Sequence, residues 1–273
     1  MLRQLEKFLV YGQIGIVNRD YEGEITGAGD TVKINGIGPV TVTPYVKNSN
    51  LADPETLTDA QTTLLINQQD SFNFQVDDID AAQQKPKVMA AAMEEAAYAL
   101  RDSADQYIAS LYTDASASNL IGSDASPKTP NNTANDTQNC YNILVDCAVK
   151  LTKSKVPTEG RFIIVPPEYY GLLLKEDKFI DYSKAGVTTG LRNGQVGMAA
   201  GFQVLQSHNV PNTNATKYKI LFGTPRAISF ANQIAKIEPY RPEKRFAEAV
   251  KGLNVYGAKV VRPEALGVLT CSF

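Results

Sequence analysis

With 273 residues, the chain is long enough to bury a substantial core without a disulfide or a metal to stabilise it. Its 27 Lys and Arg residues nearly balance its 29 Asp and Glu residues, and the net charge of −2 excludes a strong overall attraction to nucleic acid or to an anionic membrane. The three cysteines are an odd number, which fits a reducing compartment better than a secreted disulfide framework.

The N-terminal stretch MLRQLEKFLVYGQ has neither a long apolar core nor a small-residue cleavage pattern, so we expect no signal peptide. No apolar run approaches the roughly 18 residues of a membrane span, so we expect no membrane partner and synthesis in the cytosol. Residues Leu2 to Val10 fit a short amphipathic helix, because Leu5 and Leu9 follow Leu2 at helical spacing.

From Tyr21 the apolar period changes to two, which is typical of β-strands. A first alternating arm ends at Val46, and a second runs from Leu64 to Val76, with the polar turn KNSNLADPETLTDA between them from Lys47 to Ala60. Two strands alone are only marginally stable in water, so either the chain's own domain or a neighbouring subunit must cover this hairpin. The alternating apolar residues are Val32, Ile34, Val40, Val42, Val46, Leu64, Ile66, Phe72, Phe74 and Val76.

A single long helix is predicted from Pro86 to Tyr112. Proline suits a first helical turn, and apolar residues recur every three or four positions from there on. The helix would have roughly 25 residues and a length near ~40 Å. We interpret its methionines as core filler. The apolar stripe consists of Met89, Met93, Ala96, Leu100, Ala104, Ile108 and Leu111.

The remainder of the chain mixes helices and strands without regular βαβ alternation, which indicates an α+β fold. A helix should begin near Gln138, capped by Asp136 or Thr137. The stretch RFIIVPPEYYGLLL predicts a buried strand, a proline stop and a helix. Further strands are expected at Phe202–Ser207, Tyr218–Phe222 and Ala227–Glu238, followed by a terminal ribbon from Arg245 to Leu269 that alternates apolar and polar residues and contains no evident catalytic group.

Few residues are candidates for catalysis. His208 is the only histidine, and its neighbour Ser207 should point away from it on a strand, so a Ser-His-Asp site is not expected and His208 is interpreted as a turn residue. Asp77, Asp78 and Asp80 could bind a cation or act as paired carboxylates. Their position just before the long helix favours an interaction with the positive helix end or with solvent.

The remaining polar clusters also have ordinary structural interpretations. Cys140 and Cys147 share one helix face but lie about 10 Å apart along its axis, too far to bridge, so they should be buried apolar residues. The glycines at Gly190, Gly194, Gly197 and Gly201 match no phosphate-binding motif. The basic set of Arg241, Lys244 and Arg245 fits a solvated or interface charge patch better than nucleic-acid recognition.

Three stretches, RFIIVPPEYYGLLLKEDKFI, GQVGMAAGFQVLQSHNVP and RFAEAVKGLNVYGAKVVRPEAL, together resemble the major capsid protein family of tailed bacteriophages, whose fold also builds encapsulins and the floor of herpesvirus capsids. The resemblance implies an N-terminal segment, an extended loop, a spine helix, and peripheral and axial domains. The implied divisions are 1–20 for the N-terminal segment, 21–79 for the extended loop, 80–112 for the spine helix in the peripheral domain, 113–230 for the axial domain, 231–262 for peripheral strands and 263–273 for a strand returning to the axial domain.

The resemblance also implies a non-enzymatic subunit without cofactors that forms pentamers and hexamers of an icosahedral shell around double-stranded DNA, assembled in the host cytoplasm with scaffolding and portal proteins. Relatives usually carry a longer N-terminal arm. Some link an extended-loop lysine to an asparagine covalently, and Lys47 and Asn254 have the residue types, although both also fit an ordinary surface role. The implied contact residues are Lys47, Asn48, Leu51, Asp53, Glu55, Arg241, Lys244 and Arg245.

Two alternatives remain open from the residues alone. An encapsulin-like compartment would enclose a cargo enzyme, although the chain lacks the N-terminal helix typical of cargo docking. A hydrolase would use Asp78, Asp80 or His208. Alanine substitution separates the classes, because an enzyme would lose turnover whereas a shell protein would lose at most assembly.

Overall fold

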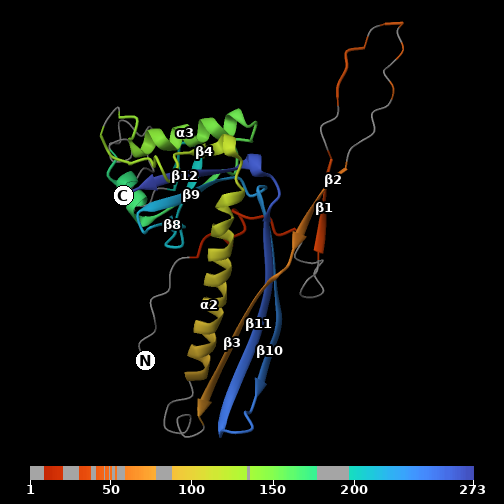
Figure 1. Cartoon of the computed structure of the whole chain (residues 1–273), viewed down its shortest axis with the longest axis vertical. Helices are drawn as coiled ribbons and strands as arrows, with labels where there is room; N and C mark the ends of the chain where they lie inside the picture. Colours follow the sequence, from red (N-terminus) through yellow and green to blue (C-terminus); the bar gives the residue numbers. More distant parts are fainter. Residues whose placement is uncertain are drawn as a thin grey trace.

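The computed structural model describes residues 9–20, 31–37, 41–45, 47–48, 50, 53, 59–77, 88–133, 136–176 and 197–273. The molecule is elongated: one long helix and three long strands lie along its axis, and a mixed sheet with further helices lies at one end (Figure 1). A two-stranded hairpin projects beside this body. This mixture of helices and antiparallel and mixed sheets confirms the predicted α+β class.

The long helix, α2, runs over Val88–Ser110 and continues as a 3₁₀ turn, η2, over Leu111–Asp114. Its predicted start at Pro86 lies outside the described residues. The apolar stripe is fully buried only in the C-terminal half of the helix, at Ala104 and Ile108, whereas its N-terminal half is only partly buried. The reason is that only the C-terminal half enters the main hydrophobic core.

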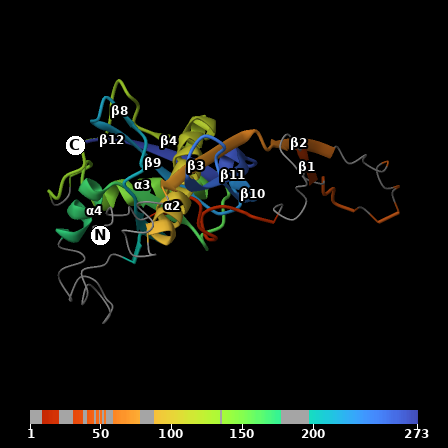
Figure 2. The same ribbon diagram turned by 90° about the horizontal axis from the view of Figure 1, so that it is seen from below.

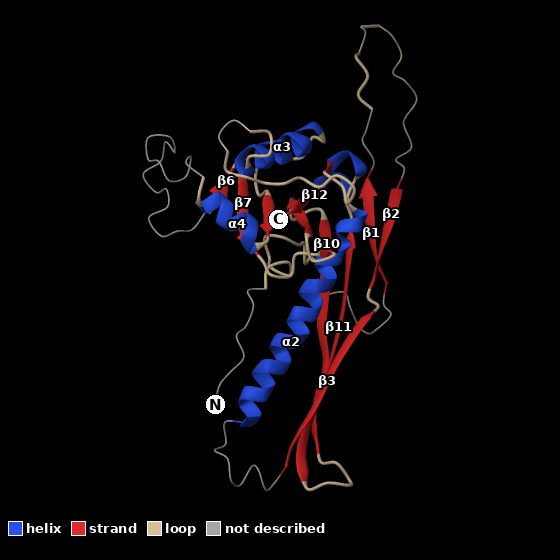
Figure 3. Ribbon diagram, turned by 60° about the vertical axis from the view of Figure 1, so that its left-hand side comes forward, coloured by secondary structure: helices blue, strands red, loops and turns tan. Residues whose placement is uncertain are grey.

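Three long antiparallel strands accompany α2 in the order β10-β11-β3 (Figure 3). They are β10 Ile228–Tyr240, β11 Ala247–Val260 and β3 Gln68–Asp77. The hydroxyl of Tyr256 donates to Asp70 Oδ2 at 2.7 Å and lies 3.3 Å from Ser103 Oγ, so one side chain connects β11, β3 and α2. The run from Phe72 to Val76, expected in the returning arm of the hairpin, therefore belongs to this sheet, because β11 is its pairing partner.

The hairpin itself pairs β1 Thr31–Ile37 with β2 Asp59–Leu65, from Thr31 opposite Leu65 to Ile37 opposite Asp59. A small separate core at its base joins it to β10 and β11 and consists of Ile34, Leu64, Ile66, Ala231 and Val255. The prediction of a strand over Val40–Val46 is wrong for its described part. Residues 41–45 form no strand, and Val42 is 91% exposed. Alternation alone does not make a strand, since a strand requires a hydrogen-bonded partner.

The mixed sheet at the end of the molecule has the order β4-β12-β9-β5-β7-β6, with β8 paired to β9 (Figure 2). Its helices are α3 and α4, and the short 3₁₀ turns η3 and η4 flank β4 and β12. The element bounds are β4 Leu120–Ile121, β5 Phe162–Val165, β6 Met198–Ala199, β7 Phe202–Gln206, β8 Asn212–Thr213, β9 Lys217–Gly223, β12 Leu266–Ser272, α3 Cys140–Lys153, α4 Pro167–Leu174, η3 Ala117–Asn119 and η4 Pro263–Ala265.

The terminal ribbon is therefore two strands in two different sheets. β11 lies at the centre of the long sheet, whereas β12 pairs with β9 and β4 in the end sheet. Between them Pro263 begins the turn η4, where the chain changes direction. The alternating pattern predicted the strands correctly, but it carries no information about which sheet each strand joins.

The N-terminal segment packs into the main core through Val10, Tyr11, Ile16 and Val17. The buried carboxylate of Asp105 on α2 accepts hydrogen bonds from the backbone N–H groups of Val10 at 3.0 Å and Gly12 at 3.2 Å. Most of the helix expected over Leu2 to Val10 lies outside the described residues, and residues 9 and 10 are not helical.

The predicted N-terminal cap of α3 is also wrong. Asn139, rather than Asp136 or Thr137, caps the helix, and its Oδ1 accepts from the backbone N–H of Tyr141 at 3.0 Å. Asp136 instead accepts from Gln138 N at 3.0 Å, within the preceding turn. Because the helix begins at Cys140, two residues later than expected, the cap position moves with it.

All three cysteines are buried and free, which confirms the interpretation of Cys140 and Cys147 as core residues. Burial, reinforced by the nearby carboxylate of Glu176, raises the pKa of the Cys140 thiol to about 12. Burial also raises the pKa of Cys147 well above its usual value. Both thiols are therefore protonated and poorly nucleophilic at neutral pH.

Candidate subunit interfaces

The projecting hairpin exposes both apolar and charged side chains. Val42 is 91% exposed and Tyr45 is 68% exposed, a large apolar surface for a segment this short. Of the expected contact residues in this segment, Lys47, Asn48 and Asp53 are exposed. Leu51 and Glu55 lie outside the described residues. A subunit surface of this kind is typical of one that a second copy covers.

A second exposed feature is the turn between β10 and β11, residues 241–246, at the end of the long sheet farthest from the mixed sheet (Figure 1). The predicted contact residues Arg241, Lys244 and Arg245 are brought together there and are exposed. Phe246 stands beside them with 86% of its surface exposed, although sequence reasoning did not identify it. The sequence carried no clear signal for it, because only the burial of Ala247 and Ala249 in the structure shows that Phe246 is on the uncovered face of the strand.

The face of the long sheet that carries Lys251 is polar. Lys236 forms an ion pair with Glu238, and Lys251 Nζ lies 3.1 Å from the same carboxylate. Hydrogen bonds and charge from Lys236 and then Lys251 hold the pKa of Glu238 below its usual value. Tyr240 donates to Asn73 Oδ1 at 3.0 Å across the sheet. This face therefore suits solvent or a wet contact better than an apolar one.

Among the described residues, those weighed for chemistry show no catalytic arrangement. His208 is exposed, whereas Ser207 is buried and its hydroxyl accepts from Asn209 N at 3.1 Å. Asp77 lies at the end of β3, and Asp78 and Asp80 lie outside the described residues. Within the described ranges, no group of three or more His, Cys, Asp or Glu residues is placed to hold a metal ion.

The surface role expected for Asn254 is wrong. The residue is 3% exposed in the middle of β11, and its Oδ1 has no hydrogen-bond partner among the described residues. It pairs with Asp70 of β3 on one side and with Ile234 of β10 on the other. A central strand position is inaccessible to the lysine of another subunit unless the sheet rearranges.

Comparison with protein families matches residues 61–269 to the family described as phage capsid protein. Among solved structures, one from Mycobacterium phage Che8 is 28% identical to this chain, with a TM-score of 0.79. The match covers 98% of this chain and 93% of the Che8 chain. The capsid structure of cyanophage P-SCSP1u is 17% identical with a TM-score of 0.77, over 100% and 90% of the two chains. No curated protein matches the chain.

An encapsulin complex from Synechococcus elongatus is also similar, at 12% identity and a TM-score of 0.58 over 97% of this chain and 91% of that one. At this identity the likeness shows the fold alone. Fold and exposed surfaces together define a shell-forming structural protein. With a family match spanning most of its length, the chain belongs to the phage capsid protein family.

The chain is accordingly a major capsid protein, a structural and non-enzymatic subunit of a bacteriophage shell. Its subunits self-assemble into shell oligomers, and it is a component of the virion capsid. Among the described residues, no helix combines the length and hydrophobicity that a membrane span needs.

Proposed function

We propose that the subunits assemble into pentamers and hexamers of an icosahedral shell that encloses double-stranded DNA. Assembly would take place in the host cytoplasm with separate scaffolding and portal proteins. The observation that carries this proposal is the projecting hairpin, whose exposed Val42 and Tyr45 the rest of the described subunit leaves uncovered. A head-to-tail contact between such a hairpin and the next subunit repeats around a ring, and rings of this kind enclose a shell.

The proposed division of the chain keeps 21–79 as the extended loop, 80–112 and 231–262 as the peripheral domain, and 113–230 with 263–273 as the axial domain. The pairing of β3 with β11 supports a modification in which the loop ends before Gln68. The proposed contact residues remain Lys47, Asn48, Leu51, Asp53 and Glu55 at the hairpin tip.

At the opposite end of the peripheral domain, Arg241, Lys244 and Arg245 are the proposed contacts, and Phe246 joins them. Its exposed ring provides the apolar anchor that a charged turn alone lacks.

Deletion of residues 48–58 tests this function. The described residues of this stretch, 48, 50 and 53, are exposed, so the subunit should stay soluble and keep its thermal unfolding temperature. Closed shells should be lost, as measured by electron microscopy after size-exclusion chromatography. A Gly-Ser segment of equal length in place of 48–58 separates the effect of side chains from that of loop length. Wild-type particle yields from the deletion would contradict the role of the hairpin.

The encapsulin-like alternative predicts a different content of the shell. Purified particles assembled with the neighbouring genes should contain nuclease-protected double-stranded DNA and no stoichiometric cargo enzyme. Particles that contain a folded enzyme and no protected DNA would favour the compartment.

A further inference from the structure

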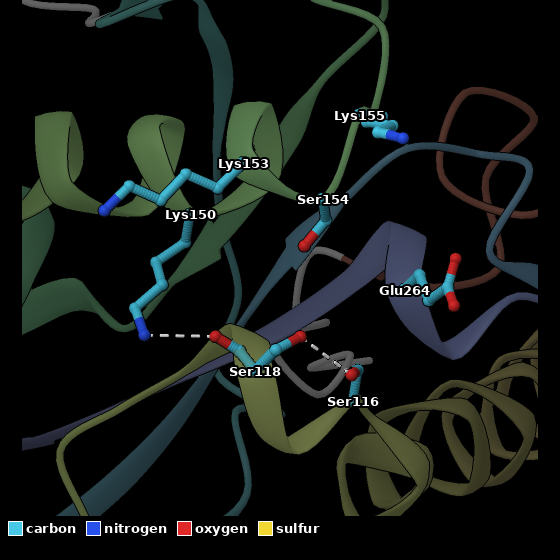
Figure 4. A pocket seen from close by; sticks show the side chains of 7 residues that line it. All are labelled: Ser116, Ser118, Lys150, Lys153, Ser154, Lys155 and Glu264. Atoms are coloured by element: carbon cyan, nitrogen blue, oxygen red, sulfur yellow. Dashed lines mark hydrogen bonds between the residues drawn. The ribbon is translucent and has the colours of Figure 1, made fainter.

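A polar groove lies at the C-terminal end of α3, beside the turns η3 and η4 of the mixed-sheet end of the subunit. Its volume is about 530 Å³. Three short segments far apart in the sequence form it: the end of α3 with the two residues after it, the turn η3, and the turn η4. The lining residues are Ser116, Ser118, Lys150, Lys153, Ser154, Lys155 and Glu264 (Figure 4).

The groove is held in shape by hydrogen bonds between these segments. Lys150 Nζ donates to the carbonyl oxygen of Ser118 at 3.0 Å, which connects α3 to η3. The hydroxyls of Ser116 and Ser118 lie 2.9 Å apart, and Ser154 donates to Asn119 Oδ1 at 2.7 Å. Asn119 is itself buried and donates to the carbonyl oxygens of Glu264 and Leu266. The groove is therefore built into the folded part of the subunit that contains the mixed sheet and α3.

The groove concentrates positive charge in a chain that is weakly negative overall. Three lysines occur within six residues, 150–155, in a chain whose net charge is −2. Lys153 and Lys155 are exposed, and Glu264 is the single acidic residue of the lining. In Figure 4, Lys150 and Lys153 lie at one end of the groove and Lys155 at the other. Separated positive charges fit an extended polyanion better than one small anion.

Lysines near a helix C-terminus can also stabilise the helix dipole. At this helix the buried cation Arg161 already lies at the same end, where it donates to Ala148 O of α3 at 3.1 Å and to Val156 O, beyond the helix, at 2.7 Å. Burial lowers the pKa of Arg161, which nevertheless remains charged at neutral pH. The exposed lysines therefore are not required to cap α3.

The composition of the groove distinguishes between a protein and a nucleic-acid partner. Lys, Ser and Glu, the only residue types that line it, are depleted from the cores of protein interfaces, which favour aromatic residues, Met and Arg. Lys and Ser side chains are, by contrast, common contacts to phosphate oxygens. No aromatic ring lines the groove, so it lacks the stacking platform that single strands require.

We propose that this groove binds the phosphate backbone of double-stranded DNA without sequence specificity, and that this end of α3 faces the interior of the shell. The inference rests on the proposed function, because it assigns the surface that meets the enclosed genome. Lysine contacts to phosphate are purely electrostatic, so binding by one subunit is weak and sensitive to salt.

The test compares two double variants with the same change of charge. Lys153→Gln/Lys155→Gln removes the two exposed cations of the groove and leaves the Lys150 hydrogen bond intact. Arg101→Gln/Arg226→Gln removes two exposed cations elsewhere, one on α2 and one in the turn before β10. Fluorescence anisotropy of a labelled DNA duplex of about 20 base pairs then gives the binding constant as a function of salt concentration.

The groove variant should bind DNA several-fold more weakly at low salt, and the slope of log K against log salt should fall by about 2. The control variant should behave as wild type. Equal losses in both variants, or no binding by the wild-type subunit at low salt, would overturn the proposal. Binding of a synthetic peptide of residues 50–60 at the groove in place of DNA would also overturn it, and would assign the groove to a subunit contact.

Electron microscopy of the same variants separates this inference from the proposed function. If both variants form closed shells while the groove variant binds DNA as well as wild type does, the inference fails and the function stands. If the wild-type protein forms no shells, the proposed function fails whatever the binding result. A density map of the shell that places the end of α3 on the outer surface would count against the proposal.

Discussion

Gly257 shows how closely two elements approach in this subunit. A Cβ at this position would lie 2.3 Å from the backbone oxygen of Leu65 and 2.9 Å from Ile66 Cα. β11 therefore passes directly over the junction of β2 and β3, and both obstructing atoms belong to the backbone. At Gly252 a Cβ would meet the ring of Phe72 instead, and that ring can rotate.

Gly257→Ala should therefore destabilise the isolated subunit by roughly 1–3 kcal/mol, since the backbone must shift to accommodate the methyl group. Gly171→Ala provides the control. That position lies in α4 with nothing within 4 Å of the added Cβ, so the change should be neutral or stabilising by up to about 1 kcal/mol. Urea unfolding measures both. A Gly257→Ala subunit as stable as the wild type would contradict the close approach of the two backbones.

Asp105 is a buried carboxylate at the centre of a small polar network. Besides Val10 and Gly12, it accepts from Asn209 Nδ2 at 3.1 Å, and the same amide donates to Asp102 Oδ1 at 2.7 Å. Burial raises the pKa of Asp105 above its ordinary value of 3.8, and its hydrogen bonds only partly oppose the shift. The carboxylate thus fixes the N-terminal segment at some cost of desolvation.

The raised pKa predicts a pH dependence of definite sign. Between pH 3.8 and the higher folded-state pKa, the folded protein binds a proton at Asp105 that the unfolded chain does not bind. The free energy of unfolding of wild type, minus that of Asp105→Asn, should therefore increase as the pH falls from 7 through this window. Denaturation of the unassembled proteins at several pH values measures the difference. A difference that decreases on acidification would show that hydrogen bonding dominates over burial.

At the scale of elements, α3 is stabilised at both ends by buried polar side chains. Asn139 caps its start and also donates to the buried Glu176 at 2.9 Å, while Arg161 donates to the carbonyl oxygen of Ala148 in its C-terminal half. Its apolar face, which includes Ile143, Leu144 and Leu151, packs into the main core. The lysine-lined groove is accordingly built on a well-anchored helix.

Asn139→Ala should destabilise the subunit by about 1 kcal/mol, because the first-turn N–H groups lose their acceptor. Thr137→Ala, at one of the two positions first expected to be the cap, should change the free energy of unfolding by less than about 0.5 kcal/mol. Thermal unfolding compares the two. If Thr137→Ala were the more destabilising substitution, the assignment of the cap to Asn139 would be wrong.

The whole molecule is divided between a well-buried end domain and an extended remainder. The main core joins the mixed sheet, α3, α4, the N-terminal segment and the C-terminal half of α2, whereas the hairpin base has only a small core of its own. The N-terminal half of α2, the hairpin and the turn 241–246 remain partly or fully exposed. Folding and assembly therefore use different surfaces of this subunit.

Phe246→Ala tests that separation. Because Phe246 is 86% exposed, the substitution should leave the unfolding temperature unchanged and reduce the yield of closed shells, seen by electron microscopy. Phe230→Ala is the contrasting variant: Phe230 is buried in the main core, and its truncation should cost about 3–5 kcal/mol. Full shell yield from Phe246→Ala would exclude this ring from the subunit contacts.

The sequence by itself determined the elements and the class of protein. Periodicity of 3.6 located α2 to within a turn at its described end, and periodicity of two located β1, β3, β10 and β11, because both periods follow from local backbone geometry. The order of these elements, with three characteristic stretches, identified the capsid family. The exposure of Arg241, Lys244 and Arg245 agrees with the charge patch expected from the sequence, and their role in subunit contacts stays a prediction.

Tertiary structure alone decided which strands pair and which side chains are covered. The alternation around Phe74 is the same whether its partner is a hairpin arm or β11. The apolar residues Val42 and Met93 look like core in the sequence, but the fold leaves Val42 exposed and Met93 only partly buried. The lysine-lined groove joins residues near 118, 153 and 264, which no local pattern connects. Local periods record the conformation of each segment, whereas pairing and burial depend on contacts between segments far apart in the chain.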